Sequence, residues 1–560
     1  MGATLGLSRT QPLRVPGAAS LAWPIGALAL MACAHLYLAT FRAVNWDEFF
    51  HFSQVHIFAN GGWLQPLQTL HARVFAWALD FPGGPIEQIR AIRWVVFLFV
   101  LGTVGAIYLL TRRFANRAVA LTCALLYLSA GFVLQHATSF RADAMIAALL
   151  MASLAILARA PLRPLTLLAI AALPALAAVE SIKVVLYAPA FAGIAWLRWS
   201  ESGFDRRTLL RLAAIPLLAA VLFGLLYLGH AHGLGGGAGA TDGAAAQVVR
   251  NSGAKMFALG GLPYYVFILK AALLALVFAV LVLCTPWVLA REDSRPRDER
   301  IALAGLWLPI TVVSFYHNTA PYFYVFILPP VAVACAPAAA RLIERYSLRA
   351  VCCLAAVSGL ALLAIEDRRA QGNQAQIIAA ADAIFDEPVA YFDFPAMLGA
   401  WPKANHFMTP WGQDGYLARQ MPSFRALMER QPVPLVIENS PAFEQLFGTT
   451  GSVPDFLPED ADTLRENYVR YWGPLHVAGR IANGGAGQQT SAFLVPGPYT
   501  VLDAPMVVDG RSLSVGSVVQ LARGVHTIGA AGPKDARLIW GDRPGVPADP
   551  APATPFWADF

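Results

Sequence analysis

Two adjacent carboxylates, Asp47 and Glu48, stand in an aromatic segment directly after the first long apolar run. Burying carboxylates beside aromatic side chains at a membrane face is costly unless they are solvated or used in chemistry. If the segment is helical, Asp47 and His51 share one face at i, i+4 spacing and can point into one cleft. Asp47 could there act as a general base on a hydroxyl. The alternative is a solvated helix start with acids in its first turn.

Three basic residues stand near the starts of later apolar runs: Arg141, Lys183 and Lys270. The planar guanidinium of Arg141 suits a phosphate, and Lys183 offers a point charge for one. The alternatives are a snorkelling Arg141 with Asp143 as its counter-ion, and a Lys183 that neutralises Glu180. Lys270 lies one to two turns inside its apolar run, where an ionisable residue is a functional candidate by default.

Aromatic and polar residues gather in the short segment 317–324 between two apolar runs. His317, Tyr322 and Tyr324 offer groups that suit a sugar ring or a lipid headgroup. The alternative interpretation is an interfacial aromatic belt.

The elements that position these residues must lie largely in lipid. Of the 560 residues, 57% are hydrophobic and only 14% are charged, and the mean hydropathy is +0.53. This composition excludes a disordered chain and an ordinary cytosolic enzyme. The net charge of +6 does not indicate a nucleic-acid partner, because the excess basic residues stand between apolar runs.

A membrane-spanning helix needs about 20 apolar residues, and the sequence predicts eleven such spans. They are 21–41, 92–111, 118–136, 142–158, 164–179, 183–199, 209–229, 263–290, 301–316, 322–340 and 349–365.

Arginines in the short loops set the predicted orientation, because basic residues favour the cytoplasmic side. With the N-terminus in the cytoplasm, one side collects 18 of them. They are Arg9, Arg14, Arg112, Arg113, Arg117, Arg159, Arg163, Arg198, Arg206, Arg207, Arg211, Arg291, Arg295, Arg297, Arg300, Arg341, Arg345 and Arg349. The first loop, 42–91, and everything after 366 then lie in the periplasm of a multi-pass protein of the bacterial inner membrane.

The predicted fold class is therefore a mainly α polytopic membrane protein with a periplasmic C-terminal domain. Residues 1–365 form the transmembrane part and residues 366–480 an α/β region. Short strands divided by Gly and Pro turns predict a small β-sandwich-like region at 481–545. The Pro/Ala-rich segment 546–560 is expected to be a loose tail.

In this topology the candidate residues all face outward. Cations that bind a phosphate leaving group, with a carboxylate that takes a proton from a hydroxyl, are the groups needed to move a sugar off a phosphate.

The chain resembles the GT-C superfamily of membrane glycosyltransferases, in particular the bacterial relatives of protein O-mannosyltransferases and lipid A aminoarabinose transferases. The resemblance covers residues 20–365 in layout. It rests on the Asp47-Glu48 pair in the first external loop, on Arg141-x-Asp143, and on Pro321–Tyr324 leading into Ile327–Pro330.

The resemblance implies an inverting transferase that uses a polyprenyl-phosphate-linked sugar, with Asp47 as base and Glu48 shaping the site or assisting. Arg141, Lys183 and Lys270 are then expected to bind the donor phosphate. The residues expected to contact sugar or acceptor are His51, Asp143, His317, Tyr322 and Tyr324.

No cofactor is required by these residues. Asp47, Glu48, His51 and His56 could hold a divalent metal, but nothing in the sequence compels one. The acceptor could be a periplasmic lipid, glycan or protein. The alternative functions are a glycan polymerase or ligase that uses lipid-linked oligosaccharide, and a transporter of lipid or sugar.

Overall fold

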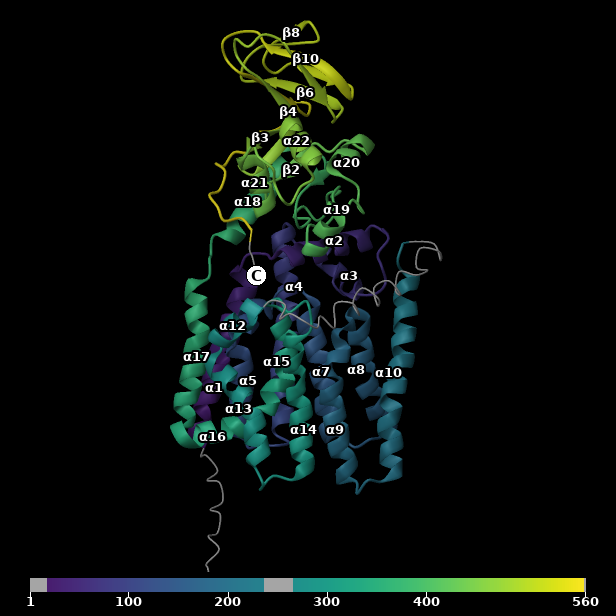
Figure 1. Cartoon of the computed structure of the whole chain (residues 1–560), viewed down its shortest axis with the longest axis vertical. Helices are drawn as coiled ribbons and strands as arrows, with labels where there is room; N and C mark the ends of the chain where they lie inside the picture. Colours follow the sequence, from purple (N-terminus) through teal and green to yellow (C-terminus); the bar gives the residue numbers. More distant parts are fainter. Residues whose placement is uncertain (1–17, 236–264, 558–560) are drawn as a thin grey trace, which may run out of the picture.

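Apolar runs in the first 365 residues form helices that lie side by side, and a strand-rich C-terminal region is stacked on one end of them (Figure 1). The computed structural model describes residues 18–235 and 265–557. The helices of the bundle are α1 (Ala18–Phe41), α4 (Pro85–Thr111), α5 (Arg117–Ser129), α6 (Gly131–His136), α7 (Ala142–Arg159), α8 (Pro164–Glu180), η2 (Ile182–Tyr187), α9 (Ala188–Glu201), α10 (Arg206–His232), α12 (Tyr265–Leu273), α13 (Leu276–Arg291), α14 (Arg297–Trp307), η4 (Leu308–Ser314), α15 (Phe323–Ala334), α16 (Ala336–Tyr346) and α17 (Leu348–Ile365).

Five helical stretches of the described residues are long and apolar enough to cross a membrane: Leu21–Phe41, α4, α7, α10 and Leu348–Ile384. The pairs α12–α13 and α15–α16 are bent by 108° and 67°, and counting each pair as one span gives up to seven. The helices α5 and α8 are apolar but shorter. The protein is therefore embedded in a membrane, whereas the eleven crossings and their orientation stay predictions.

The helix α2 (Trp46–Ala59), with α3 (Leu70–Val74) and η1 (Ala76–Asp80), covers the end of the bundle that faces the C-terminal region (Figure 1). We call this end the capped end. Asn45 starts α2 with a capping box: its side chain accepts from the N–H of Asp47, and its own N–H donates to Glu48.

Aromatic contacts hold α2 against the C-terminal region. The ring of Trp46 packs edge-on against Phe394, with centroids 4.3 Å apart, and Phe50 stacks on Phe407 at 4.4 Å. Because α2 thus lies between the bundle and the C-terminal region, the acidic residues in its first turn are covered from both sides.

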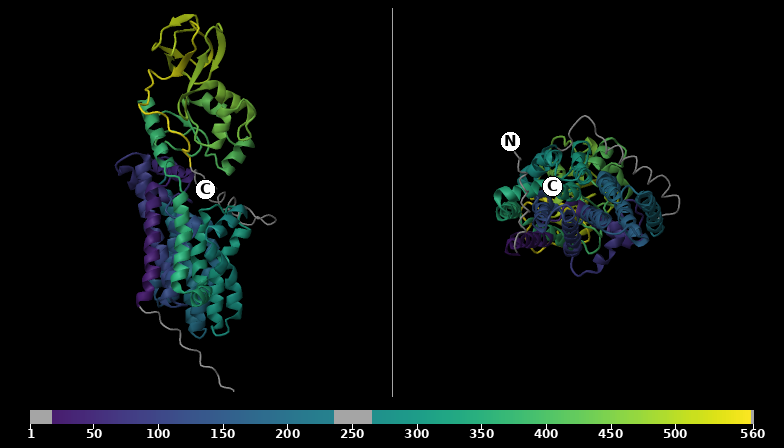
Figure 2. Two further views of the ribbon diagram at one scale, coloured as in Figure 1. Left: turned by 90° about the vertical axis from the view of Figure 1, so that its left-hand side faces the viewer. Right: turned by 90° about the horizontal axis from the view of Figure 1, so that it is seen from below.

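The C-terminal region rises along the long axis of the molecule (Figure 2). It begins with α18 (Ala370–Ile384) and contains α19 (Pro410–Leu417), α20 (Phe424–Arg430), α21 (Pro441–Gly448) and α22 (Pro458–Asn467). Its strands are β1 (Tyr391–Phe392), β2 (Leu435–Ile437), β3 (Tyr468–Trp472), β4 (Leu475–Ala482), β5 (Gln489–Phe493), β6 (Gly497–Leu502), β7 (Met506–Val508), β8 (Arg511–Leu513), β9 (Val518–Leu521), β10 (Gly524–Ala530) and β11 (Ala536–Trp540).

One seven-stranded sheet joins the two parts that the sequence predicted as separate regions. Its order is β1-β2-β4-β11-β6-β9, with β3 also paired to β4. The first half of β4 pairs with β2 and β3, and its second half pairs with β11. The boundary expected after residue 480 therefore falls inside a strand. A second sheet, β5-β10-β7-β8, packs on the half of the first sheet that contains β11, β6 and β9. The core between the two sheets includes Tyr499, Val501 and Ile528.

The segment expected to be a loose tail is described by the structure over residues 546–557. These residues contact other elements of the C-terminal region. Trp472 donates to the carbonyl of Asp549, and Asn373 donates to those of Ala553 and Pro555. Phe556 is buried in the main core. These contacts form although the segment has no regular secondary structure, because backbone carbonyls of a Pro-rich segment can be satisfied by side chains from distant elements, which composition does not reveal.

Candidate active site

The first turn of α2 meets the loop before α7 through an ion pair between Asp47 and Arg141. Arg141 precedes α7 as its N-cap residue, with extended backbone, so its side chain reaches across the capped end. The side chains are 17% exposed for Asp47 and 10% for Arg141. At this exposure the two charges interact more strongly than a solvated surface pair does.

Asp143, one residue into α7, joins two cations. Its Oδ2 lies 3.3 Å from Nε of Arg141, and its Oδ1 lies 3.0 Å from Nζ of Lys183. The guanidinium of Arg141 lies over the ring of Tyr322, 3.4 Å from its centroid, and Nζ of Lys183 lies 5.3 Å from the same centroid. Tyr322 is fixed in turn by a 3.0 Å hydrogen bond from its hydroxyl to Asn318. Four chain segments thus meet at one cluster of charges.

This cluster forms part of the wall of a cavity of about 480 Å³ at the capped end. The polar side chains that line it are His51, Gln54, Gln65, Gln68, Thr69, Arg141, Asp143, Glu180, Ser181, Lys183, Tyr316, Asn318 and Tyr322. Asp47 is not part of the lining; it stands one helical turn before His51 and contacts the lining residue Arg141. The structure therefore places Arg141 beside Asp47, and it places Arg141, Lys183 and His51 in the lining of one cavity.

Glu48 lies elsewhere than expected. It is fully buried and forms a two-pronged ion pair with Arg93 of α4, with contacts of 2.7 and 2.5 Å. It also accepts from the N–H of Phe140 at 2.6 Å, while Arg93 donates to the carbonyls of Arg42 and Ala43. Glu48 therefore ties α2 to the loop that carries Arg141, and we correct the expected catalytic role to a positioning one.

Arg93 was not among the residues singled out from the sequence. It stands inside the apolar run 92–111, and the rule that an ionisable residue within an apolar run needs a partner would have found it.

Three other expected site residues lie outside the cavity. Lys270 lines a separate cavity of about 440 Å³ with Arg42, Gln135 and Glu366. Tyr324 is buried in α15, its ring 5.3 Å from that of Phe132. His317 belongs to the turn before Tyr322 but is not part of the lining. The expectations failed because sharing one membrane face does not fix which helix pair a side chain points between.

Behind the cavity, His51 belongs to a chain of hydrogen bonds. Its Nδ1 lies 3.2 Å from Nε2 of His71, whose Nδ1 lies 2.7 Å from Glu180. Because a carboxylate only accepts, Nδ1 of His71 carries a proton. Burial, with the neighbouring His71, lowers the pKa of His51 to about 3. His51 is thus a neutral hydrogen-bonding group near pH 7. His71 was missed because no pattern in the loop 42–91 marks it.

The carboxylates at this site do not form a metal-binding set. Asp47 faces Arg141 and Glu48 faces Arg93, so the four residues considered from the sequence do not converge. Within residues 18–235 and 265–557, no group of three or more His, Cys, Asp or Glu side chains is arranged to hold a metal. No step proposed below passes through one.

With the geometry in place, comparison with known proteins identifies the fold. No family model and no curated protein sequence matches the chain. Among solved structures, ArnT from Cupriavidus metallidurans bound to undecaprenyl phosphate matches 77% of this chain and 95% of its own, with 14% identity and a TM-score of 0.53. An oligosaccharyltransferase from Archaeoglobus fulgidus in complex with zinc and sulfate matches 90% and 94%, with 11% identity and a TM-score of 0.53.

These neighbours are GT-C superfamily membrane glycosyltransferases, and the chain has the GT-C fold. The resemblance noted from the acidic pair and the Arg141-x-Asp143 motif is thereby confirmed at the level of fold.

Proposed function

We propose that this protein is an inverting glycosyltransferase that moves a sugar from a polyprenyl-phosphate donor to an acceptor at the capped end. The observation that carries the proposal is the pairing of Asp47 with Arg141, which lines one cavity together with Lys183, within a GT-C fold. A cavity of about 480 Å³ is large enough for a sugar with its phosphate.

The proposed reaction uses each charged group for one task. The oxygen of an acceptor hydroxyl attacks the anomeric carbon, and the bond from that carbon to the phosphate oxygen breaks. Asp47 takes the hydroxyl proton. Arg141 and Lys183 stabilise the negative charge that develops on the departing phosphate. Asp143 holds both cations at a fixed separation through its two oxygens.

Donor binding itself prepares Asp47 in this proposal. In the absence of donor its carboxylate is paired with Arg141. A phosphate that takes up the guanidinium competes with this pair, because a phosphate accepts two parallel N–H bonds from an arginine. The carboxylate is then released toward the acceptor, so that the base is available once the donor is in place.

The donor is proposed to be a lipid because of the side on which the cavity opens. The basic loops at the opposite end of the bundle indicate the cytoplasm, so the capped end faces the periplasm. Nucleotide sugars are cytosolic, whereas a polyprenyl phosphate can enter laterally from the outer leaflet of the inner membrane. The acceptor is a periplasmic lipid, glycan or protein.

A second candidate is transfer of a whole oligosaccharide by a polymerase or ligase. It is supported by the likeness to the Archaeoglobus fulgidus oligosaccharyltransferase, which extends over 90% of this chain. Both reactions use the same charged groups and differ in the size of the donor. The third function considered from the sequence, transport of a lipid or sugar, gains no support, because the candidate charged residues within or beside the apolar runs, Asp143, Lys183 and Lys270, all lie toward the capped end.

The purified protein, incubated with polyprenyl-phosphate hexose labelled in the sugar and with an extract of cell-envelope glycans and lipids, tests the proposal. We expect labelled sugar in the acceptor fraction and free polyprenyl phosphate in equal amount. Label transferred only from a lipid-linked oligosaccharide would establish block transfer instead. Movement of intact labelled lipid between vesicle leaflets without cleavage would contradict both.

The lysines of the two cavities give a matched comparison. Lys183→Met removes a phosphate-facing charge, so we expect turnover to fall about 10²–10³-fold, the loss typical of one charge-stabilising donor. Lys270→Met, in the separate cavity, is expected to change turnover by less than about threefold. Steady-state rates of polyprenyl phosphate release measure both. A large loss for Lys270→Met with a small loss for Lys183→Met would move the phosphate to the other cavity.

A further inference from the structure

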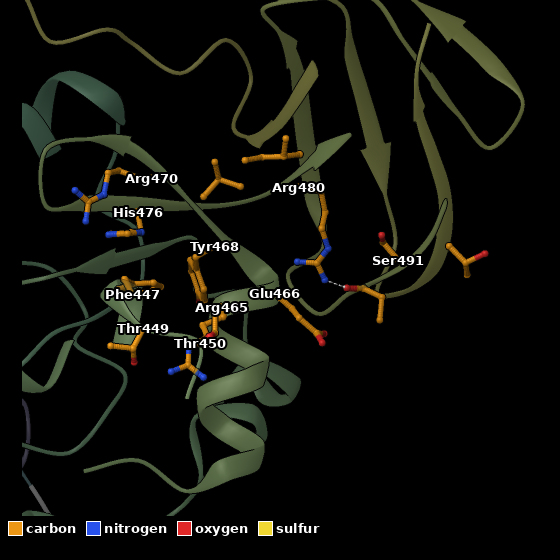
Figure 3. Close-up of a pocket in the computed structure, with 14 residues that line it drawn as sticks. Phe447, Thr449, Thr450, Arg465, Glu466, Tyr468, Arg470, His476, Arg480 and Ser491 are labelled. Carbon is orange, nitrogen blue, oxygen red and sulfur yellow. Dashed lines mark hydrogen bonds between the residues drawn. The ribbon is translucent and has the colours of Figure 1, made fainter. Parts of the chain in front are cut away.

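Another cavity lies away from the proposed active site, in the C-terminal region. It has a volume of about 690 Å³ and is bounded by α22, β3 and β4 on one side and by β5 on the other. Figure 3 shows Phe447, Tyr468, Arg470 and His476 on one wall and Arg480 and Ser491 toward the other. Nothing in the proposed reaction uses this space.

Arg480 on β4 is a buried cation at this cavity. The residue is 8% exposed. Its guanidinium donates to the carbonyls of Gly479 and Ala492 and to the side chain of Asn467, all of them neutral. Among the residues that the structure describes, no carboxylate lies within 4.0 Å of it. A buried charge is costly without a paired opposite charge. Glu466 interacts with Arg480 only from beyond ion-pair distance, so the site favours a closer anion.

The other charged residues of the lining single out Arg480. Arg465 and Arg470 also line the cavity, with one carboxylate, Glu466, but Arg470 is paired with Glu438 at 2.7 Å and Arg465 with Asp462 at 3.6 Å. Residues 366–560 as a whole carry 14 Lys and Arg against 21 Asp and Glu. Arg480 is thus the lining arginine that has no ion pair among the described residues, and an anionic ligand is attracted to it rather than to the acidic surrounding surface.

The remaining lining groups suit a sugar. Phe447 and His476 stack face to face with centroids 3.8 Å apart, which presents an aromatic surface for the apolar face of a pyranose ring. The hydroxyls of Thr449, Thr450, Thr490 and Ser491 also line the cavity, and each can donate and accept a hydrogen bond. A few placed polar groups around an aromatic surface are typical of small-ligand sites.

We propose that this cavity binds an acidic saccharide, with the carboxylate or phosphate of the sugar against Arg480 and its ring near Phe447. A peptide is the other ligand class that the surroundings admit, because β5 pairs only with β10 and is an edge strand of its sheet. The buried cation and the hydroxyl lining favour the saccharide. The binding of an acidic saccharide does not depend on the proposed function. A role of this cavity in presenting an acceptor glycan to the active site does rest on it.

Calorimetry on the full-length protein in detergent tests the binding. The probe is a galacturonic acid trisaccharide, and its control is the same trisaccharide with the carboxyl groups reduced. We expect saturable binding of the acidic form, at least about tenfold weaker binding of the neutral form, and weakening with salt, as for a charge-assisted contact. Equal affinity for the two forms, or no binding of the acidic one, would overturn the proposal.

Two variants locate the site. Arg480→Gln and Ser491→Trp, which fills the cavity while keeping the cation, are each expected to weaken binding at least about tenfold. Arg511→Gln, an exposed arginine on β8, is the control and should bind normally. Unchanged binding in Ser491→Trp, or competition by an extended glutamate peptide of similar affinity, would contradict a saccharide site.

Rates of polyprenyl phosphate release, measured on the same samples without added saccharide, separate this inference from the proposed function. Normal release with no trisaccharide binding rejects only the inference, and absent release with intact binding rejects only the transferase.

Discussion

Asp47→Asn is expected to lower kcat for sugar transfer about 10²–10⁴-fold, the usual loss when a general base is removed. Asparagine keeps the size of the side chain and can still accept from Arg141 through its amide oxygen, but it cannot take a proton from the acceptor hydroxyl. The KM for the donor is expected to fall, because Arg141 and Lys183 remain in place and a neutral asparagine competes less with the donor phosphate for Arg141. Single-turnover rates at saturating donor measure the effect.

Asp143→Asn is the informative control, because Asp143 lines the cavity beside the same two cations. Removing its charge loosens Arg141 and Lys183, so we expect a raised KM for the donor together with a smaller loss in kcat. A near-normal kcat in Asp47→Asn, with a loss of the full size in Asp143→Asn, would transfer the role of base to Asp143.

Arg93→Met is expected to destabilise the protein by about 3–5 kcal/mol, because it leaves the carboxylate of Glu48 buried without its partner. The Glu48 side chain is fully buried and Arg93 is 2% exposed. The change also frees the carbonyls of Arg42 and Ala43. The midpoint of thermal unfolding in detergent, or the fraction that survives denaturant, measures the loss.

Arg90→Met on the same helix provides the matched comparison. Arg90 lies 3.8 Å from Glu87, with both side chains more than a quarter exposed, and such surface pairs contribute about 0–1 kcal/mol. A stability loss in Arg93→Met no larger than that in Arg90→Met would contradict the structural role assigned to the Glu48–Arg93 pair.

The helical part of the fold follows from apolar runs, and each of the eleven expected spans is helical where the structure describes it. Hydropathy does not predict where such a run bends. The helices α12 and α13 are bent by 108°. The bend lies at Ala275, directly before α13, because the backbone dihedral angles of this residue are not helical. How many of these runs cross the bilayer is therefore harder to predict than which of them are helical.

Part of the site was predictable from the sequence, and the rest depends on contacts between distant elements. Sidedness alone indicated that Asp47, Arg141 and Lys183 could meet, and the structure places them together. Adjacent residues on a helix point about 100° apart, so Asp47 and Glu48 cannot share a role. Which of the two contacts Arg141 depends on the rotation of α2, and that rotation is set by the pairing of Glu48 with Arg93 and by the packing of Trp46 on Phe394. Neither contact is visible in a local pattern.

A structure of the protein with bound polyprenyl phosphate tests the central claim most directly. The account predicts phosphate oxygens within hydrogen-bond distance of Arg141 and Lys183, and a carboxylate of Asp47 no longer paired with Arg141. A phosphate bound instead beside Lys270 and Arg42, with the Asp47–Arg141 pair intact, would contradict it.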